Sequence, residues 1–160
     1  MRYILVLVTL FNLIIASHTY GEFINRVVAY VDNIPITLLD FEKEYLKMKE
    51  KLPNIEKEEV ISTMINKTVL LKKAKELFLE GKEEELLNSY IDLKIKASII
   101  IPENQIRQYY EQNKTKINKP YSSVRAQIEN YLYERELNKK LKEHIEELKE
   151  AVEIKIVFIP

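Results

Sequence analysis

The chain has 160 residues, and its 25 lysines and arginines are balanced by 25 aspartates and glutamates, so that the formal net charge is zero. This balance excludes the strongly basic field that draws a protein to nucleic acid or anionic lipid. The chain has no cysteine, which excludes a disulfide framework, and only two glycines, which excludes a glycine-rich phosphate loop.

Residues 1–21 have the three-part order of a secretory signal peptide. A short positive start precedes an almost entirely apolar run over 3–16 and the small or polar residues SHTYG. The apolar run is shorter than the ~20 residues that a helix needs to cross a bilayer. We therefore predict export and cleavage after Gly21. His18 and Tyr20 make the cleavage site imperfect, so an uncleaved membrane anchor is the alternative.

Residues 22–160 are predicted to form one mainly helical domain, because lysine, glutamate, isoleucine and leucine dominate the composition. The domain starts with a hairpin. A run of β-branched and aromatic residues over 23–31 is followed by a turn at Asp32-Asn33 and a return strand at 34–36. Pro35 lacks a backbone N–H, so we expect the return strand at a sheet edge.

Three amphipathic helices are predicted next. Thr37 followed by Asp40 resembles a capping box and starts a helix that stops before Pro53. The second helix covers about 57–78, and its apolar face is broad enough for a central helix with several partners. The third starts with the acidic residues 83–85. We expect four of its residues on one apolar face: Leu86, Tyr90, Leu93 and Ala97.

A short helix over 102–114, with Ile106, Tyr109 and Tyr110 on its apolar side, is predicted before a polar connection over 115–119. The longest helix then runs from about 120 to 150. Its apolar residues form two stripes, turned by roughly 120° from each other. The stripes are Val124, Ile128, Tyr131 and Leu132, then Leu137, Leu141, Ile145 and Leu148. We predict that this helix leaves one partner and meets another, or reaches a second chain.

The last segment, 152–159, alternates as a strand does, and the hairpin is its obvious partner. The predicted fold class is therefore mainly α, a helical bundle with a small antiparallel sheet made by the N-terminal hairpin and the C-terminal strand.

The sequence offers little for catalysis. His144 is the one histidine after the signal peptide, and its neighbours Lys142, Glu143 and Glu146 indicate a solvated surface residue. A catalytic or metal-binding histidine needs convergent partners, and the sequence suggests none. We expect no catalytic residue, no cofactor and no metal.

Four segments resemble, in the same order, the peptide-binding fold of the SurA and trigger-factor family of chaperones. Residues 23–45 (FINRVVAYVDNIPITLLDFEKEY) are similar to the family's passage from hairpin to first helix, and residues 60–77 (VISTMINKTVLLKKAKEL) to the helix after it. Residues 101–114 resemble the segment that leads into a parvulin prolyl-isomerase domain in relatives. Residues 119–156 resemble the helix and strand that follow that domain.

One departure from the family bears on catalysis. Where a parvulin relative carries a whole catalytic domain, this chain has only residues 111–119. The resemblance therefore implies a SurA-like chaperone domain over 22–160 without an inserted parvulin domain, and no isomerase activity carries over.

The resemblance implies a periplasmic holdase that binds unfolded or outer-membrane polypeptides, and it implies neither nucleic acid nor a small-molecule substrate as a partner. Holding such clients needs an exposed apolar or aromatic groove. Tyrosine suits that task, because it combines apolar area with a polar tip. The candidate substrate-binding residues are Tyr109, Tyr110, Val124, Ile128, Tyr131 and Tyr133.

Two other functions stay open. The chain could be a structural or interaction module, for example a homodimer that exchanges its long helix and terminal strand between protomers. The third and weakest hypothesis is an enzyme whose catalytic groups the sequence does not reveal.

Overall fold

The computed structural model describes residues 26–160, so the predicted signal peptide and its cleavage site lie outside the described part. Within that part, the chain forms five α-helices, one short 3-10 helix and a three-stranded antiparallel sheet. The predicted fold class is confirmed: the protein is mainly α, with a small sheet that joins the N-terminal hairpin to the C-terminal strand.

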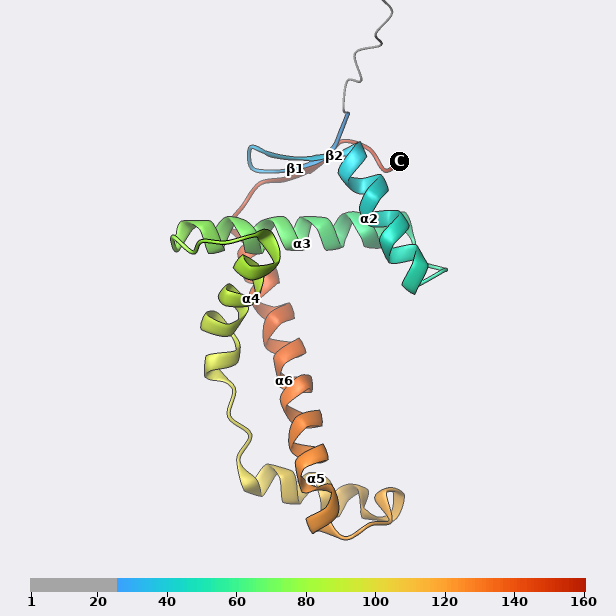
Figure 1. Cartoon of the computed structure of the whole chain (residues 1–160), viewed down its shortest axis with the longest axis vertical. Coiled ribbons are helices and arrows are strands. Elements are labelled where there is room, and N and C mark those ends of the chain that lie inside the picture. Colours follow the sequence, from blue (N-terminus) through green and yellow to red (C-terminus); the bar gives the residue numbers. More distant parts are fainter. Residues whose placement is uncertain (1–25) are drawn as a thin grey trace, which may run out of the picture.

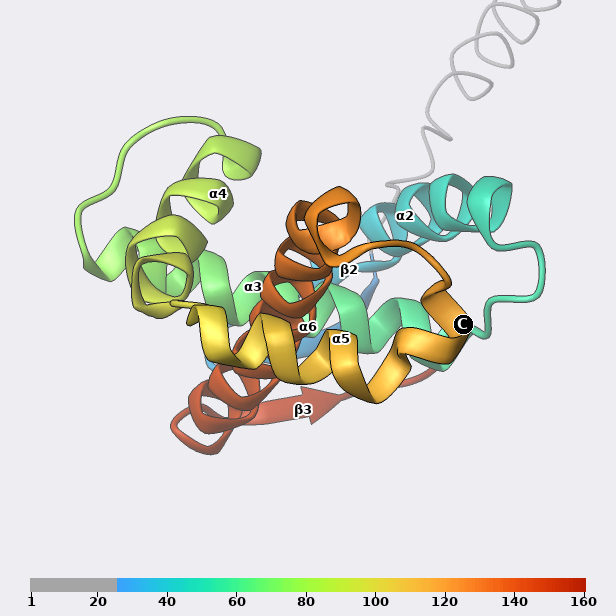
Figure 2. The ribbon, with the colours of Figure 1, turned by 90° about the horizontal axis from the view of Figure 1, so that it is seen from below.

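The sheet, α2 (Leu38–Lys51) and α3 (Lys57–Glu76) form a head. From this head α6 (Tyr121–Glu150) extends as an arm and carries α5 (Glu103–Ile117) at its far end (Figure 1). Seen along the arm, α2 and α4 (Glu83–Lys94) lie on opposite sides of α6 (Figure 2). The helices therefore form a hooked arrangement rather than one parallel bundle.

In the sheet, β1 (Val27–Val31) lies between β2 (Ile34–Thr37) and β3 (Ile154–Ile156) and is antiparallel to both. Pro35 is on an edge strand, as predicted. The C-terminal strand is shorter than the predicted 152–159. Beyond β3, the N–H groups of Val157 and Phe158 both donate to the carbonyl of Val28, at 2.8 and 3.4 Å. This breaks the alternation that a strand requires.

Helix α2 starts as its sequence predicts. The hydroxyl of Thr37 accepts a hydrogen bond from the backbone N–H of Asp40 at 3.2 Å and donates one to the Asp40 carboxylate at 2.6 Å. Phe41 is buried against the sheet and α3, and its ring stacks on Tyr45 with centroids 5.8 Å apart. The cap and this aromatic contact fix the direction in which α2 leaves the sheet.

Helix α3 is the central helix that its broad apolar face predicts, because it packs against the sheet, α2, α4 and α6. It ends in a Schellman motif. The N–H of Phe78 donates to the carbonyl of Lys75 at 2.9 Å, and the N–H of Leu79 donates to that of Ala74 at 3.2 Å. Phe78 adopts the left-handed φ of 56°, at the position that helices usually give to glycine.

The third predicted helix is shorter than expected, because α4 ends at Lys94 and a 3-10 helix follows at Lys96–Ser98. Of the four residues expected on its buried face, Leu86 and Tyr90 are buried, whereas Leu93 and Ala97 are exposed. The prediction is wrong for the latter two because the core that covers α4 ends before Leu93. A 3-10 helix has three residues per turn, so the α-helical spacing is lost there, and Ile95 and Ile99, which flank the 3-10 helix, are buried instead.

The predicted partner switch of α6 is confirmed. Its first half packs on α5, and its second half packs on α3 and α4. The link between α5 and α6 is shorter than the predicted 115–119, because α5 continues to Ile117 and Asn118 caps it in the left-handed conformation with φ of 45°. Within the chain, α5 covers the first stripe except for Tyr131, which is half exposed, and α3 and α4 partly cover the second stripe.

Among residues 26–160, all buried residues except Ile95 and Ile99 fall into three separate clusters. The head cluster joins the sheet, α2 and the first half of α3. The middle cluster joins the second half of α3 to α4 and α6. The tip cluster lies between α5 and α6 and contains Ile106, Tyr110, Val124, Ile128 and Leu132.

Candidate functional site

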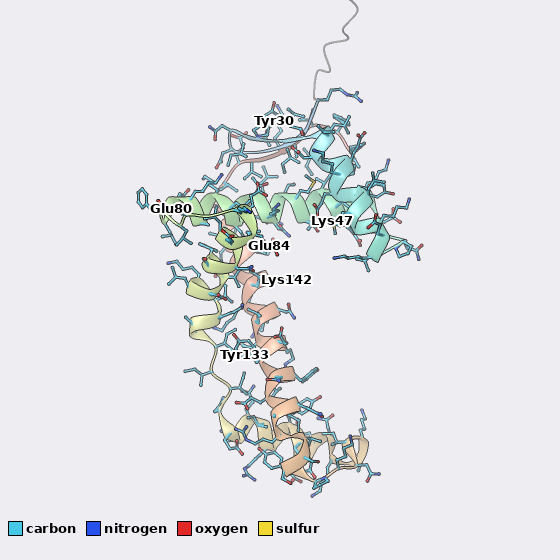
Figure 3. The ribbon with its side chains drawn as sticks, in the orientation of Figure 1. Tyr30, Lys47, Glu80, Glu84, Tyr133 and Lys142 are labelled. Atoms are coloured by element: carbon cyan, nitrogen blue, oxygen red, sulfur yellow. The ribbon has the colours of Figure 1, made fainter. Side chains whose placement is uncertain are left out.

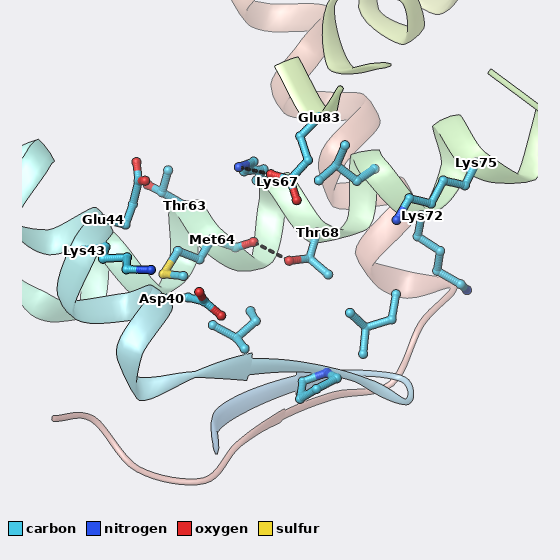
Figure 4. A pocket seen from close by; sticks show the side chains of 14 residues that line it. Asp40, Lys43, Glu44, Thr63, Met64, Lys67, Thr68, Lys72, Lys75 and Glu83 are labelled. Atoms are coloured by element: carbon cyan, nitrogen blue, oxygen red, sulfur yellow. Dashed lines mark hydrogen bonds and ion pairs between the residues drawn. The ribbon is translucent and has the colours of Figure 1, made fainter. Parts of the chain in front are cut away.

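A groove of about 380 Å³ lies between the free edge of the sheet and α3 (Figure 4). β2, the first turns of α2 and one face of α3 form its walls, and Glu83 of α4 closes one side. This arrangement follows from the hairpin at the start of the chain, which holds β2 across α3. The groove is lined by Ile34, Pro35, Ile36, Asp40, Lys43, Glu44, Thr63, Met64, Lys67, Thr68, Leu71, Lys72, Lys75 and Glu83.

Apolar side chains and one small polar residue form the interior of the groove. Met64 and Leu71 from α3 face Ile34 and Ile36 from β2 across it. Thr68 lies between Met64 and Leu71, and its hydroxyl donates to the Met64 carbonyl at 2.8 Å. The hydroxyl therefore needs no hydrogen-bond acceptor from a ligand. Such an interior can accept apolar side chains without leaving a polar group unpaired.

Charged side chains surround the groove, and some of them already have partners. Lys67 forms an ion pair with Glu83 at 2.6 Å, and Lys72 forms one with Asp32 at 2.8 Å. The Lys72 ammonium lowers the pKa of the Asp32 carboxyl, and a hydrogen bond of 2.8 Å from the N–H of Glu153 acts in the same direction. These contacts tie the hairpin turn to α3 and to β3.

Four charged side chains that line the groove, Asp40, Lys43, Glu44 and Lys75, form no ion pair with any residue between Arg26 and Pro160. In Figure 4, Glu44 and Lys43 lie at the α2 end of the groove and Lys75 lies at the other end. The rim can therefore pair with charges of either sign.

A second, more open hollow of about 540 Å³ lies between the end of α2 and the start of α3. Its lining includes Met48, Leu52 and Ile55, together with the carboxylates of Glu58 and Glu59. Thr63 lines both hollows, so the two adjoin along α3. Together they offer a longer surface than a single side chain would fill.

Three of the predicted substrate-binding residues lie in the core instead of on a surface. Tyr110, Val124 and Ile128 belong to the tip cluster and are covered by the contact of α5 with α6. The Tyr110 hydroxyl donates to the Lys119 carbonyl at 2.9 Å, which also satisfies its polar end. As an exposed site, the prediction fails for these three, because a helix contact inside the chain already uses the stripe that suggested it.

The other three predicted residues reach the surface but do not gather at one place. Tyr109 and Tyr131 lie together, with ring centroids 5.2 Å apart, and Tyr131 is half exposed. Burial is the main cause of the raised pKa of Tyr109, and Tyr131 adds to it. Tyr133 lies on the side of α6 that faces the segment between α4 and α5 (Figure 3).

His144 is not the solvated residue that its neighbours indicate. Its Nε2 lies 2.8 Å from the Tyr90 hydroxyl, and the two rings stack with centroids 5.8 Å apart. Burial raises the pKa of Tyr90. The pair joins α4 to α6 beside the middle cluster. Tyr90 and His144 are 54 residues apart in the sequence, so local spacing could not predict their contact.

The groove could not be predicted from the sequence. Met64 and Leu71 lie on the broad apolar face that the sequence predicts for this helix, and local spacing does not show that a groove lined by both remains between that face and β2. The one available signal was Thr68, a small hydroxyl residue between apolar positions of a broad helix face.

Among residues 26–160, no group of three or more His, Cys, Asp or Glu side chains could hold a metal ion. In the same part of the chain, no helix combines the length and apolar character needed to cross a membrane.

Comparisons with protein-family models, with curated proteins and with solved structures find no match to this chain. The resemblance to the SurA and trigger-factor family therefore rests on the order of the sequence segments alone.

Proposed function

We propose that this chain is a non-catalytic periplasmic holdase that binds extended segments of unfolded polypeptide, including outer-membrane polypeptides. The observation that carries the proposal is the groove between β2 and α3, with its apolar interior and a rim of both charge signs. The sequence resemblance to a family of peptide-binding chaperones supports the same function independently.

The groove suits a client of variable sequence. A volume of about 380 Å³ is at the small end of ligand pockets, enough for one or two client side chains. Burial of a large apolar side chain contributes about 1.5–3 kcal/mol, which is modest once the loss of client freedom is counted. We therefore expect weak, reversible binding of single segments, as a holdase requires.

Side chains, not a shared β-ladder, are expected to hold the client. β2 has four residues, and Pro35 in its middle has no N–H to donate to an added strand. A short edge strand with a proline is a poor template for another strand. The client chain would therefore lie along α3, with its apolar residues directed into the groove.

Aggregation of a denatured outer-membrane protein tests the proposal. We expect the purified protein to slow the growth of light scattering when such a client is diluted out of urea. Thr68→Tyr fills the groove and should remove most of this effect. Ile100→Ser, on the exposed connection between α4 and α5, is the matched control and should retain it. A wild-type protein that leaves aggregation unchanged at several-fold molar excess over the client would contradict the proposal.

A structural or interaction module remains the second candidate. The observation that favours it is Phe78, whose side chain is 91% exposed.

A further inference from the structure

Phe78 has an unfavourable backbone conformation for a phenylalanine, and its ring does not pack in the core of its own chain. It occupies the left-handed position of the Schellman motif, with φ of 56°. Its side chain is 91% exposed, so packing within the chain does not compensate for the strain. Leu77 beside it is also exposed. A large aromatic side chain in a strained and exposed position indicates a role outside the single chain.

We propose that Phe78 docks into the β2–α3 groove of a second copy of this chain, in a symmetric dimer to which each copy contributes one Phe78 and one groove. This inference goes beyond the proposed function and does not depend on it, because self-association is measured without a client.

The groove has the chemistry to receive an aromatic ring. Met64 and Leu71 supply apolar contacts, and Thr68 between them leaves room. Lysines at the rim can lie over the ring face, a contact that lysines also make within the chain, where the Lys49 ammonium lies 5.2 Å from the Tyr45 ring centroid.

The positions of Phe78 and the groove on one helix make a closed dimer geometrically simple. The groove reaches Lys75, three residues before Phe78, and its centre at Thr68 is about 15 Å away along the helix axis. Two α3 helices placed antiparallel around a two-fold axis would bring each Phe78 to the other groove at the same time. Such an isologous contact closes on itself and gives a dimer rather than a filament.

Charges near Phe78 complement the rim. Glu80, which lies at the end of α3 away from Lys47 of α2 (Figure 3), makes no ion pair within residues 26–160. Lys43, at the α2 end of the rim, is likewise without such a pair, and it is the rim lysine that the antiparallel arrangement brings toward Glu80 of the other copy. A second copy fits better than an anionic lipid surface, because Glu80 offsets the neighbouring lysines and leaves no basic cluster around the ring.

The test measures molar mass by light scattering from about 5 µM to about 500 µM. We expect the mass of the wild type to rise toward twice that of the monomer. Phe78→Gly and Thr68→Tyr should each lower the association constant at least about tenfold, while Ile100→Ala, at an exposed isoleucine outside the groove, should leave it unchanged. Phe78→Gly suits the left-handed backbone, so loss of folding should not confuse the result.

Mixing the two variants makes the test specific. Phe78→Gly retains a groove and Thr68→Tyr retains a Phe78, so the mixture should form heterodimers with one intact contact, beyond what either variant forms alone. Three results would overturn the proposal: a monomeric wild type at every concentration, undiminished association of Phe78→Gly, or a mixture that associates no better than its components. Phe78-dependent binding to phosphatidylglycerol vesicles without self-association would also overturn it, and would assign Phe78 to a lipid surface.

Discussion

At the scale of single residues, the strain at Phe78 has a measurable size. A left-handed conformation costs a residue with a Cβ about 1–2 kcal/mol, and glycine escapes this cost while adding up to about 1 kcal/mol of unfolded-chain entropy. Because the ring is exposed, its loss removes little packing. We expect Phe78→Gly to raise the free energy of unfolding by about 0.5–1 kcal/mol in urea titrations at about 1 µM protein. Phe78→Ala, which retains the strain, is the control. Equal stability of the two variants would contradict this account.

Asp32 gives a second prediction at this scale, because its carboxylate joins the hairpin turn to Lys72 and to the N–H of Glu153. Its pKa is lowered in the folded state, so its stabilisation is present above the unfolded pKa of about 3.9 and is lost as the pH falls through the folded pKa. Asp32→Asn should therefore unfold at lower urea than the wild type at about pH 7, and the difference should shrink below about pH 4.

Asp92→Asn serves as the control for this measurement, since within residues 26–160 Asp92 pairs only with Lys96, one turn away on an exposed surface. A difference between wild type and Asp32→Asn that stays constant from neutral to acid pH would show that the carboxylate charge is not what stabilises the turn.

At the scale of elements, the separate tip cluster predicts local rather than global effects. Leu132 is fully buried between α5 and α6, and a buried Leu→Ala change costs about 2–5 kcal/mol. We expect Leu132→Ala to speed amide hydrogen exchange in α5 and the first half of α6, with little change in the sheet. Ile65→Ala in the head cluster should do the reverse. Equal acceleration in both regions for both variants would mean that head and tip unfold as one unit.

Several features of individual elements could be predicted from the sequence. The two stripes of α6, the cap at Thr37 and the edge position of Pro35 follow from local spacing and from the chemistry of one or two residues, and the structure confirms them. The end of α4 at Lys94 was missed, because the limit of the core that covers it is set by residues of other elements.

The candidate site was harder to predict for the same reason. The aromatic residues of the last third were expected at a surface, but an apolar stripe has the same spacing whether a client or another helix covers it. The groove arises where β2, α2, α3 and α4 meet, and no window of the sequence contains all four.

At the scale of the whole molecule, the hook-shaped chain separates its surfaces. The groove lies in the head, and the pair of Tyr109 and Tyr131 joins α5 to the first half of α6, in the arm that Figure 1 shows leading away from the head. A client long enough to contact both the groove and the tyrosine pair would bind more tightly than to either alone, because one rigid helix links the two weak sites. The groove remains the central site, because it combines an apolar interior with rim charges that have no ion pair in the described part of the chain.

Site-specific photo-crosslinking tests whether an unfolded client occupies the groove. A photoreactive phenylalanine analogue replaces Thr63, which lines both hollows, and the same analogue replaces Ile100 as an exposed reference. With an unfolded outer-membrane polypeptide as client, we predict strong crosslinks from position 63, at most weak ones from position 100, and loss of the former when Thr68→Tyr fills the groove. Crosslinks of equal strength from both positions, or crosslinks from position 63 that Thr68→Tyr does not weaken, would contradict the account.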